Sequence, residues 1–195
     1  MRIGVFGGTF DPPHVGHLLV ASDAREALKL DRLIFVPAGA QPFKIHTPPV
    51  ASGQDRVEML RLAIADDANY VVDDAEINRK GLSFTVDTLE HLSERHPAAR
   101  LFLLLGEDLL ASFEQWRNPA RIRELATLAA VRRAGPASSV VGPVEPVAPG
   151  VLMVSTRRVD VSSTEVRERL RAGKSIKGFV PESVERFIDA RGLYR

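Results

Sequence analysis

Two histidines stand next to a glycine turn near the start of the chain. A short buried strand is predicted over residues 3–6, and residues 7–17, Gly-Gly-Thr-Phe-Asp-Pro-Pro-His-Val-Gly-His, lead from it into a helical pattern. His14 and His17 are therefore expected one turn apart at the start of a helix. Backbone N–H groups and the helix dipole attract phosphate to such a place. Because the dipole opposes an imidazolium there, the two histidines favour a site that handles phosphate.

Two other interpretations of this motif stay open on the residues alone. A tight strand-to-helix turn with solvent-exposed histidines needs no ligand at all. A zinc site is a further alternative, although two histidines at this spacing lack the third ligand found in zinc sites of the H-E-x-x-H type. The Walker A and G-x-G-x-x-G patterns are both absent from this motif.

A second helix start carries hydroxyls and a cation. Ser162 followed three residues later by Glu165 predicts a capping box. Capping does not account for the run Ser-Ser-Thr, nor for Arg167 in a turn where the dipole repels cations. A second anion site would use the hydroxyls, the N–H groups and the guanidinium together. Two such sites in one small α/β domain indicate a nucleoside triphosphate.

The elements that must position these residues follow an α/β pattern. Apolar runs bounded by turn residues alternate with helical periodicity, which predicts a parallel sheet with crossover helices. A helical part over residues 162–195 is expected to extend a single domain of residues 1–195. Strands are expected at 2–6, 32–36, 70–73, 100–105, 127–131 and 151–154, and helices at 15–30, 54–65, 84–95, 162–172 and 181–191.

Two stretches between these elements are rich in proline and glycine. Long loops without structure of their own are usually functional or disordered. Residues 37–53 follow a strand end, where open α/β sheets bind ligands, so we expect them to serve the site. Residues 134–150 carry little charge, and we expect a tolerated excursion there.

The composition limits the classes of function. The 195 residues are 45% hydrophobic and 26% charged, which argues against wholesale disorder. A formal net charge of +1 predicts neither a nucleic-acid nor a membrane surface. The chain has no cysteine, so thiolate chemistry is excluded and a reducing compartment is compatible. With no run of about 20 apolar residues and no signal peptide, the sequence predicts a cytoplasmic protein.

The motifs together resemble a known superfamily. Gly-Thr-Phe-Asp-Pro before His14-Val-Gly-His17, with Ser-Ser-Thr-x-x-Arg later, is similar to the HxGH nucleotidyltransferases. Over essentially all 195 residues the chain resembles the bacterial nicotinate-nucleotide adenylyltransferases. The motifs that select this family are Phe35-Val-Pro-Ala-Gly39, Ser83-Phe-Thr-Val-Asp-Thr88, Leu105-Gly-Glu-Asp108 and Val159-Asp-Val-Ser-Ser-Thr164.

The resemblance implies a Rossmann-like sheet with helices on both faces and a definite reaction. Such enzymes join ATP and nicotinate mononucleotide into nicotinate adenine dinucleotide and release pyrophosphate, with Mg²⁺ present. The mononucleotide phosphate attacks the α-phosphorus in line, without a covalent enzyme intermediate. We expect the Mg²⁺ to be held mainly through the ATP phosphates and water rather than by protein ligands. A homo-oligomer is left open.

The resemblance also implies roles for individual residues. Those expected to be catalytic are His14, His17 and Arg167. Those expected to bind ATP are Gly8, Thr9, Phe10, His14, His17, Gly106, Asp108, Ser163, Thr164 and Arg167. Those expected to bind the mononucleotide are Thr85, Trp116, Lys44 and Arg133, with Trp116 stacking on the nicotinate ring.

Three alternatives remain at this stage. A sister enzyme would use phosphopantetheine or another phosphate acceptor. A nucleotide-sensing module would bind ATP without turnover. Within the family itself, the residues do not decide between the nicotinate and the nicotinamide mononucleotide.

Overall fold

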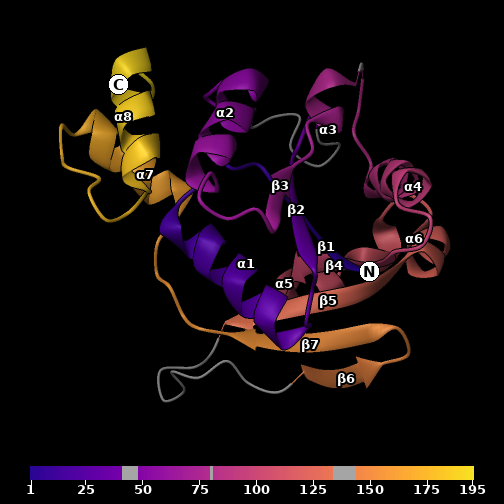
Figure 1. Cartoon of the computed structure of the whole chain (residues 1–195). Coiled ribbons are helices and arrows are strands. Elements are labelled where there is room, and N and C mark those ends of the chain that lie inside the picture. The colour runs from indigo at the N-terminus through magenta and orange to yellow at the C-terminus, as the bar shows by residue number, and fades with distance from the viewer. Residues whose placement is uncertain (41–47, 80, 134–143) are drawn as a thin grey trace.

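A mostly parallel sheet forms the centre of the computed structural model, which describes the chain except for residues 41–47, 80 and 134–143 and the side chain of Arg133. The strand order is β3-β2-β1-β4-β5-β7-β6, and within it only the β6–β7 pair is antiparallel (Figure 1). The strands are β1 (Arg2–Gly8), β2 (Arg32–Pro37), β3 (Tyr70–Val72), β4 (Arg100–Gly106), β5 (Ala126–Arg133), β6 (Val144–Ala148) and β7 (Val151–Thr156).

Helices cover both faces of this sheet, as the sequence predicts. Side chains along β4 alternate, so that Leu103 enters the hydrophobic cluster of one face and Leu104 that of the other. The helices α1 (Val15–Ala27) and α2 (Gly53–Ala63) pack on the face of Leu104, and α4 (Thr85–Arg95) and α6 (Pro119–Leu125) on the face of Leu103. In the described part of the chain, no helix combines the length and apolarity needed to cross a membrane.

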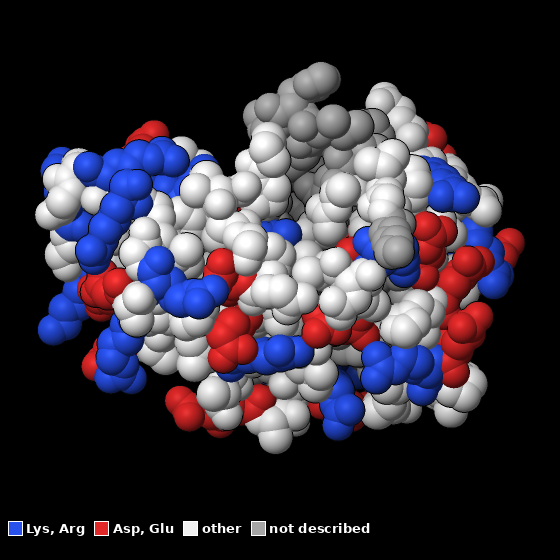
Figure 2. Space-filling view, turned by 90° about the horizontal axis from the view of Figure 1, so that it is seen from above, with Lys and Arg blue, Asp and Glu red and all other residues white. Residues whose placement is uncertain are grey.

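The two C-terminal helices, α7 (Ser163–Arg171) and α8 (Glu182–Arg191), share a third hydrophobic cluster with α2. Val166 of α7 and Ile188 of α8 are fully buried against Met59 of α2, and Tyr194 joins the same cluster. Figure 1 shows these helices beside α2 at one side of the sheet. Lys and Arg side chains gather at that end of the molecule in Figure 2, whereas both signs of charge are interspersed over the rest of the described surface on this face.

The structure differs in three places from the elements predicted from the sequence. The first helix ends at Ala27, because Lys29 takes a left-handed φ of 50° and the chain turns toward β2. Part of the expected excursion at 134–150 is the strand β6, which pairs with β7 as an edge strand, where Pro146 is tolerated. Short elements without readable periodicity were not predicted, namely α3 (Ala75–Asn78), α5 (Glu107–Leu110), the 3₁₀ turn η2 (Phe113–Gln115) and α6.

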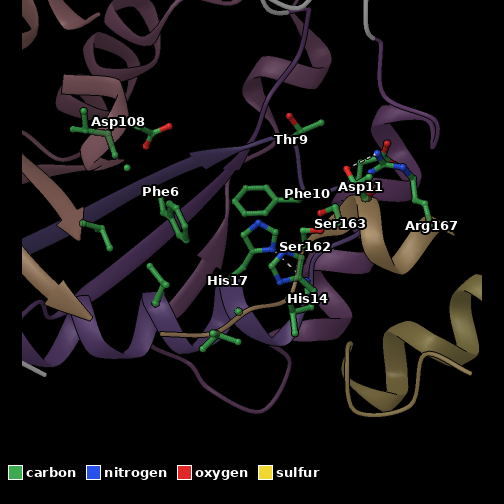
Figure 3. A pocket seen from close by; sticks show the side chains of 18 of the residues that line it. Phe6, Thr9, Phe10, Asp11, His14, His17, Asp108, Ser162, Ser163 and Arg167 are labelled. Atoms are coloured by element: carbon green, nitrogen blue, oxygen red, sulfur yellow. Dashed lines mark hydrogen bonds between the residues drawn. The ribbon is translucent and has the colours of Figure 1, made fainter. Parts of the chain in front are cut away.

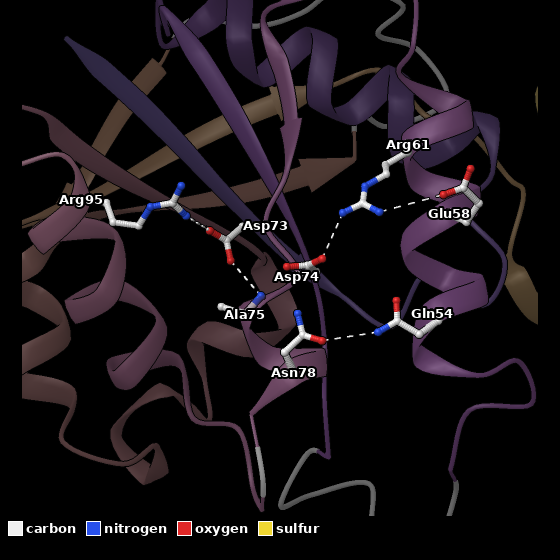
Figure 4. A network of polar contacts seen from close by, with 8 residues as sticks. All are labelled: Gln54, Glu58, Arg61, Asp73, Asp74, Ala75, Asn78 and Arg95. Atoms are coloured by element: carbon white, nitrogen blue, oxygen red, sulfur yellow. Dashed lines mark hydrogen bonds and ion pairs between the residues drawn. The ribbon is translucent and has the colours of Figure 1, made fainter.

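A polar network holds the short helix α3 between α2 and α4 (Figure 4). The carboxylate of Asp73 accepts hydrogen bonds from the Ala75 amide (3.0 Å) and from Arg95 of α4 (2.8 Å). Asp74 pairs with Arg61 of α2 at 3.0 Å. This placement matters because α3 lines one of the two cavities described next.

Candidate functional site

Two cavities adjoin at the carboxyl ends of β1 and β4. The larger encloses about 1060 Å³ and the smaller about 390 Å³. Phe6, Leu105 and Gly106 line both, so the cavities share a wall. Open α/β sheets bind ligands at this edge. The arrangement suits two ligands that lie next to each other.

The two histidines lie together in the larger cavity at the start of α1 (Figure 3). His14 is the N-cap residue and His17 the third residue of the helix, as the sequence predicts. Their rings stack with centroids 3.7 Å apart and planes inclined by 30°. Phe10 packs edge-on against His17 with the centroids 4.9 Å apart, which fixes the orientation of the pair.

A backbone hydrogen bond sets the tautomer of His17. The amide N–H of His14 donates to Nδ1 of His17 at 3.2 Å. Nδ1 must therefore keep its lone pair, and a neutral His17 carries its proton on Nε2. The ring thus enters the cavity as a hydrogen-bond donor at Nε2, which suits an anionic oxygen.

The glycine turn has a packing reason that the sequence did not reveal. A Cβ on Gly8 would come within 2.8 Å of the Phe10 ring, which is only 1% exposed. Phe10 itself has a left-handed φ of 51°, a conformation that is rare outside glycine and tends to occur at functional sites. Gly8 lines the smaller cavity, whereas Thr9 and Phe10 line the larger one.

The second helix start meets the first at the larger cavity. Ser162 caps α7 by accepting the amide of Glu165 at 3.1 Å. The hydroxyl of Ser163 donates to the carbonyl oxygen of Pro12 at 2.8 Å, and Nη1 of Arg167 donates to the carbonyl oxygen of Asp11 at 2.7 Å. The two junctions, far apart in sequence, are therefore hydrogen-bonded to each other at one cavity.

The opposite end of the larger cavity is formed after β4. Gly106 and Asp108 line the cavity there, and Figure 3 shows Asp108 across the histidine pair from Arg167. A Cβ on Gly106 would stand 2.4 Å from Oδ1 of Asp108, so the carboxylate lies directly against the backbone of this glycine and would have to rotate away from a larger residue. At the same end Arg132 forms a bidentate pair with Glu107 at 2.8 and 3.0 Å, and these hydrogen bonds lower the pKa of the Glu107 carboxyl.

The larger cavity also contains Arg157, an arginine that no motif in the sequence indicated. Arg157 donates to the carboxylate of Asp23 in a fork, with its Nη2 and Nε 2.7 and 2.9 Å from Oδ1. Asp23 is fully buried in α1. The sequence could have indicated this pair only through the position of Asp23, an acidic residue among apolar neighbours in a helical pattern. The pair ties the segment after β7 to α1 and fixes one wall of the cavity.

The smaller cavity is largely apolar and holds a tryptophan. Trp116 and Thr85, to which the resemblance gives a role at the nicotinate ring, both line it. Trp116 packs against Phe113 with the ring centroids 5.4 Å apart. Arg117 lies over the Phe84 ring at 4.5 Å in the same wall. Lys44 lies outside the described residues, and Arg133 is described only through its backbone at the end of β5.

Acidic and histidine side chains are the groups of this site that could ligate a metal ion. Among them, no group of three or more His, Asp or Glu side chains stands close enough to hold a metal ion. Asp11 and Glu107, two of the acidic residues of the larger cavity, already accept hydrogen bonds from other groups. The described part of the site therefore offers no protein cage for Mg²⁺.

Comparison with known proteins gives consistent results. The family model described as cytidylyltransferase-like matches residues 5–169. A probable nicotinate-nucleotide adenylyltransferase of Gemmatimonas aurantiaca is 46% identical, over 100% of this chain and 93% of that protein. A protein of Thermus thermophilus with the same name is 44% identical over the whole of both chains.

The fold is also found in solved structures. Nicotinic acid mononucleotide adenylyltransferase of Plasmodium falciparum, solved in complex with NaAD, superposes with a TM-score of 0.75 over 99% of this chain and 97% of that one, at 17% identity. At this identity the likeness supports the fold alone. With full-length relatives above 40% identity, the chain belongs to the nicotinate-nucleotide adenylyltransferase family.

Proposed function

We propose that this protein transfers AMP from ATP to nicotinate mononucleotide, giving nicotinate adenine dinucleotide and pyrophosphate. The observation that carries the proposal is the pair of adjoining cavities, with two hydrogen-bonded helix starts in the larger one. A shared wall at Phe6, Leu105 and Gly106 would bring the acceptor phosphate to the α-phosphorus of ATP. The cytoplasmic location stays a prediction.

ATP occupies the larger cavity in this proposal. Its ribose lies near Gly106 and Asp108, and its triphosphate extends past the histidines to the start of α7. His17 donates from Nε2 to the oxygens on which charge develops during transfer, and His14 orients it by stacking. Nucleotidyl transfer needs such positioned donors more than a nucleophilic side chain.

The leaving pyrophosphate is assigned to the start of α7. Ser163, Thr164 and Arg167 line the cavity there and would hold the β- and γ-phosphates. Arg167 uses Nη1 on Asp11 and Nη2 on Thr164, and its buried Nε has no hydrogen-bond partner among the described residues. The guanidinium is thereby oriented before ATP arrives, which lowers the entropic cost of binding.

The mononucleotide occupies the smaller cavity. Its ring stacks on Trp116, and Thr85 lies beside it at the start of α4. Lys44 and Arg133 are proposed to contact the acceptor, as the resemblance implies. Mg²⁺ neutralises phosphate charge when bound, and we assign it to the ATP phosphates and water, because the described residues provide no cage.

Pyrophosphate release with a panel of acceptors tests this function. The purified chain is incubated with ATP, Mg²⁺ and one of nicotinate mononucleotide, nicotinamide mononucleotide or phosphopantetheine. Release with the nicotinate mononucleotide, together with formation of the dinucleotide, is expected. Release with phosphopantetheine only would identify a sister enzyme, and ATP binding without release would identify a binding module.

A matched pair of arginines tests the phosphate assignment. Arg167→Ala is expected to raise the KM for ATP and lower the rate. Arg171→Ala removes an exposed arginine from the end of the same helix and is expected to behave as wild type. Equal kinetics for the two variants would contradict the role of Arg167.

A further inference from the structure

The backbone of the loop that carries the histidines is held from behind by donors of distant elements. Nη1 of Arg56 in α2 donates to the carbonyl oxygen of Thr9 at 2.7 Å, in addition to the bonds from Ser163 and Arg167. Burial lowers the pKa of Arg56, although an arginine stays protonated. The carbonyl oxygens of Thr9, Asp11 and Pro12 therefore all accept hydrogen bonds from side chains of α2 and α7.

The side chain of Asp11 joins this loop to two further segments. The carboxylate is 4% exposed, and it accepts the amides of Val50 at 2.7 Å and Ala51 at 3.0 Å. The hydroxyl of Tyr194 donates to Oδ1 at 2.7 Å. Hydrogen bonds to an ionised group are roughly twice as strong as neutral ones. Asp11 is therefore hydrogen-bonded on both sides: its carboxylate accepts from Val50, Ala51 and Tyr194, and its backbone carbonyl accepts from Arg167.

Tyr194 is built into the structure so that its hydroxyl reaches the carboxylate of Asp11. After α8 the chain turns at Gly192, with φ of 61°, and Tyr194 takes φ of 66°. The tyrosine is 5% exposed in the cluster of α2, α7 and α8. Burial, followed by the hydrogen bond to Asp11, raises the pKa of Tyr194 well above its usual range, so the hydroxyl stays protonated and donates. A side chain needed only to fill this cluster would not require the hydroxyl.

We propose that Tyr194 is a positioning residue for ATP, which acts through Asp11 on the phosphate-binding loop and on Arg167. The hydroxyl holds the carboxylate, the carboxylate fixes the backbone of Asp11, and the carbonyl of that residue fixes the guanidinium. The C-terminal helices thereby complete the ATP cavity from outside it. This inference rests on the proposed function, and nothing in it concerns the mononucleotide cavity.

The test compares two variants that each remove one hydroxyl. Tyr194→Phe keeps the ring in its cluster but removes the donor to Asp11. Ser183→Ala is the matched control, because its hydroxyl ties α8 to the carbonyl of Leu62 in α2 at 3.0 Å and contacts neither Asp11 nor the loop. A loosened helix would affect both variants alike, whereas a lost positioning contact affects only the first.

Steady-state kinetics supply a readout that general destabilisation would not move. Tyr194→Phe is expected to raise the KM for ATP about tenfold, the size of one charge-assisted hydrogen bond, and to change the KM for nicotinate mononucleotide less than about twofold. In an Arg167→Ala background the same substitution is expected to change the KM for ATP much less. An unchanged KM for ATP, or an equal effect in both backgrounds, would overturn the inference.

Calorimetry with a non-hydrolysable ATP analogue repeats the comparison at low temperature and without turnover. Weaker binding by Tyr194→Phe than by Ser183→Ala is expected, and equal affinities would refute the inference independently of the kinetics. Failure of the proposed function has a different signature, because wild-type protein would then release no pyrophosphate with nicotinate mononucleotide.

Discussion

The two nitrogens of His17 have separate tasks, and this separation can be tested. Nδ1 accepts the amide of His14 at 3.2 Å, which supports the start of α1, while Nε2 is proposed to donate a hydrogen bond to the phosphate being transferred. An asparagine amide reaches about as far as Nδ1 of the histidine it replaces, and a glutamine amide about as far as Nε2. His17→Asn therefore keeps an acceptor for the His14 amide, and His17→Gln keeps a donor in the cavity.

The expected magnitudes follow from these contacts. Loss of one positioned donor costs about 10²–10³-fold in kcat, so His17→Asn is expected to lose turnover by that factor. His17→Gln is expected to retain at least about ten times more turnover than His17→Asn. Loss of the acceptor for the His14 amide costs roughly 1 kcal/mol of stability. His17→Gln, although the more active variant, is therefore expected to have a lower free energy of unfolding than His17→Asn.

The assay is pyrophosphate release at saturating ATP and nicotinate mononucleotide, beside denaturant unfolding of each variant. His96→Ala, which removes a histidine at the end of α4 and outside both cavities, serves as the control. Turnover of His17→Asn equal to or above that of His17→Gln would refute the assignment of the donor to Nε2.

Four further outcomes are expected. Trp116→Ala should raise the KM for the mononucleotide about tenfold, since stacking contributes about 1–3 kcal/mol, and should leave the KM for ATP unchanged in the same assay. Asp23→Ala should lower the free energy of unfolding in urea, because it removes the buried carboxylate that accepts hydrogen bonds from the guanidinium and the amide of Arg157. Gly39→Ala should cost about 1–3 kcal/mol by thermal unfolding, since its Cβ would stand 2.4 Å from a carbonyl oxygen of α3. The pKa of Tyr194 is raised in the folded state, so its contribution to stability is complete below about pH 10 and is lost as the pH rises further. Tyr194→Phe should therefore make the fall of Tm above about pH 10 less steep. An equally steep fall in the variant and the wild type would contradict this.

Local signals determined much of the architecture. The unbroken apolar run of β4 predicted a strand buried on both faces, and Ser162 with Glu165 predicted the start of α7. The spacing of His14 and His17 predicted a pair on one helical turn. Each of these features depends on residues within a few positions of one another, so a periodicity or a capping motif is enough to predict it.

Other features were decided only by tertiary packing. Asp11 belongs to a motif that the sequence analysis quoted, yet its partners are the amides of residues 50 and 51 and a hydroxyl 183 positions away. Arg167 was predicted to hold phosphate, and the structure adds that one of its nitrogens holds the loop of the histidines. Such long-range partners cannot be predicted from local periodicity. A buried carboxylate always needs hydrogen-bond donors, but only the path of the folded chain decides which donors reach it. The sequence therefore singled out the residues that are expected to handle phosphate, and the fold decided what holds them in place.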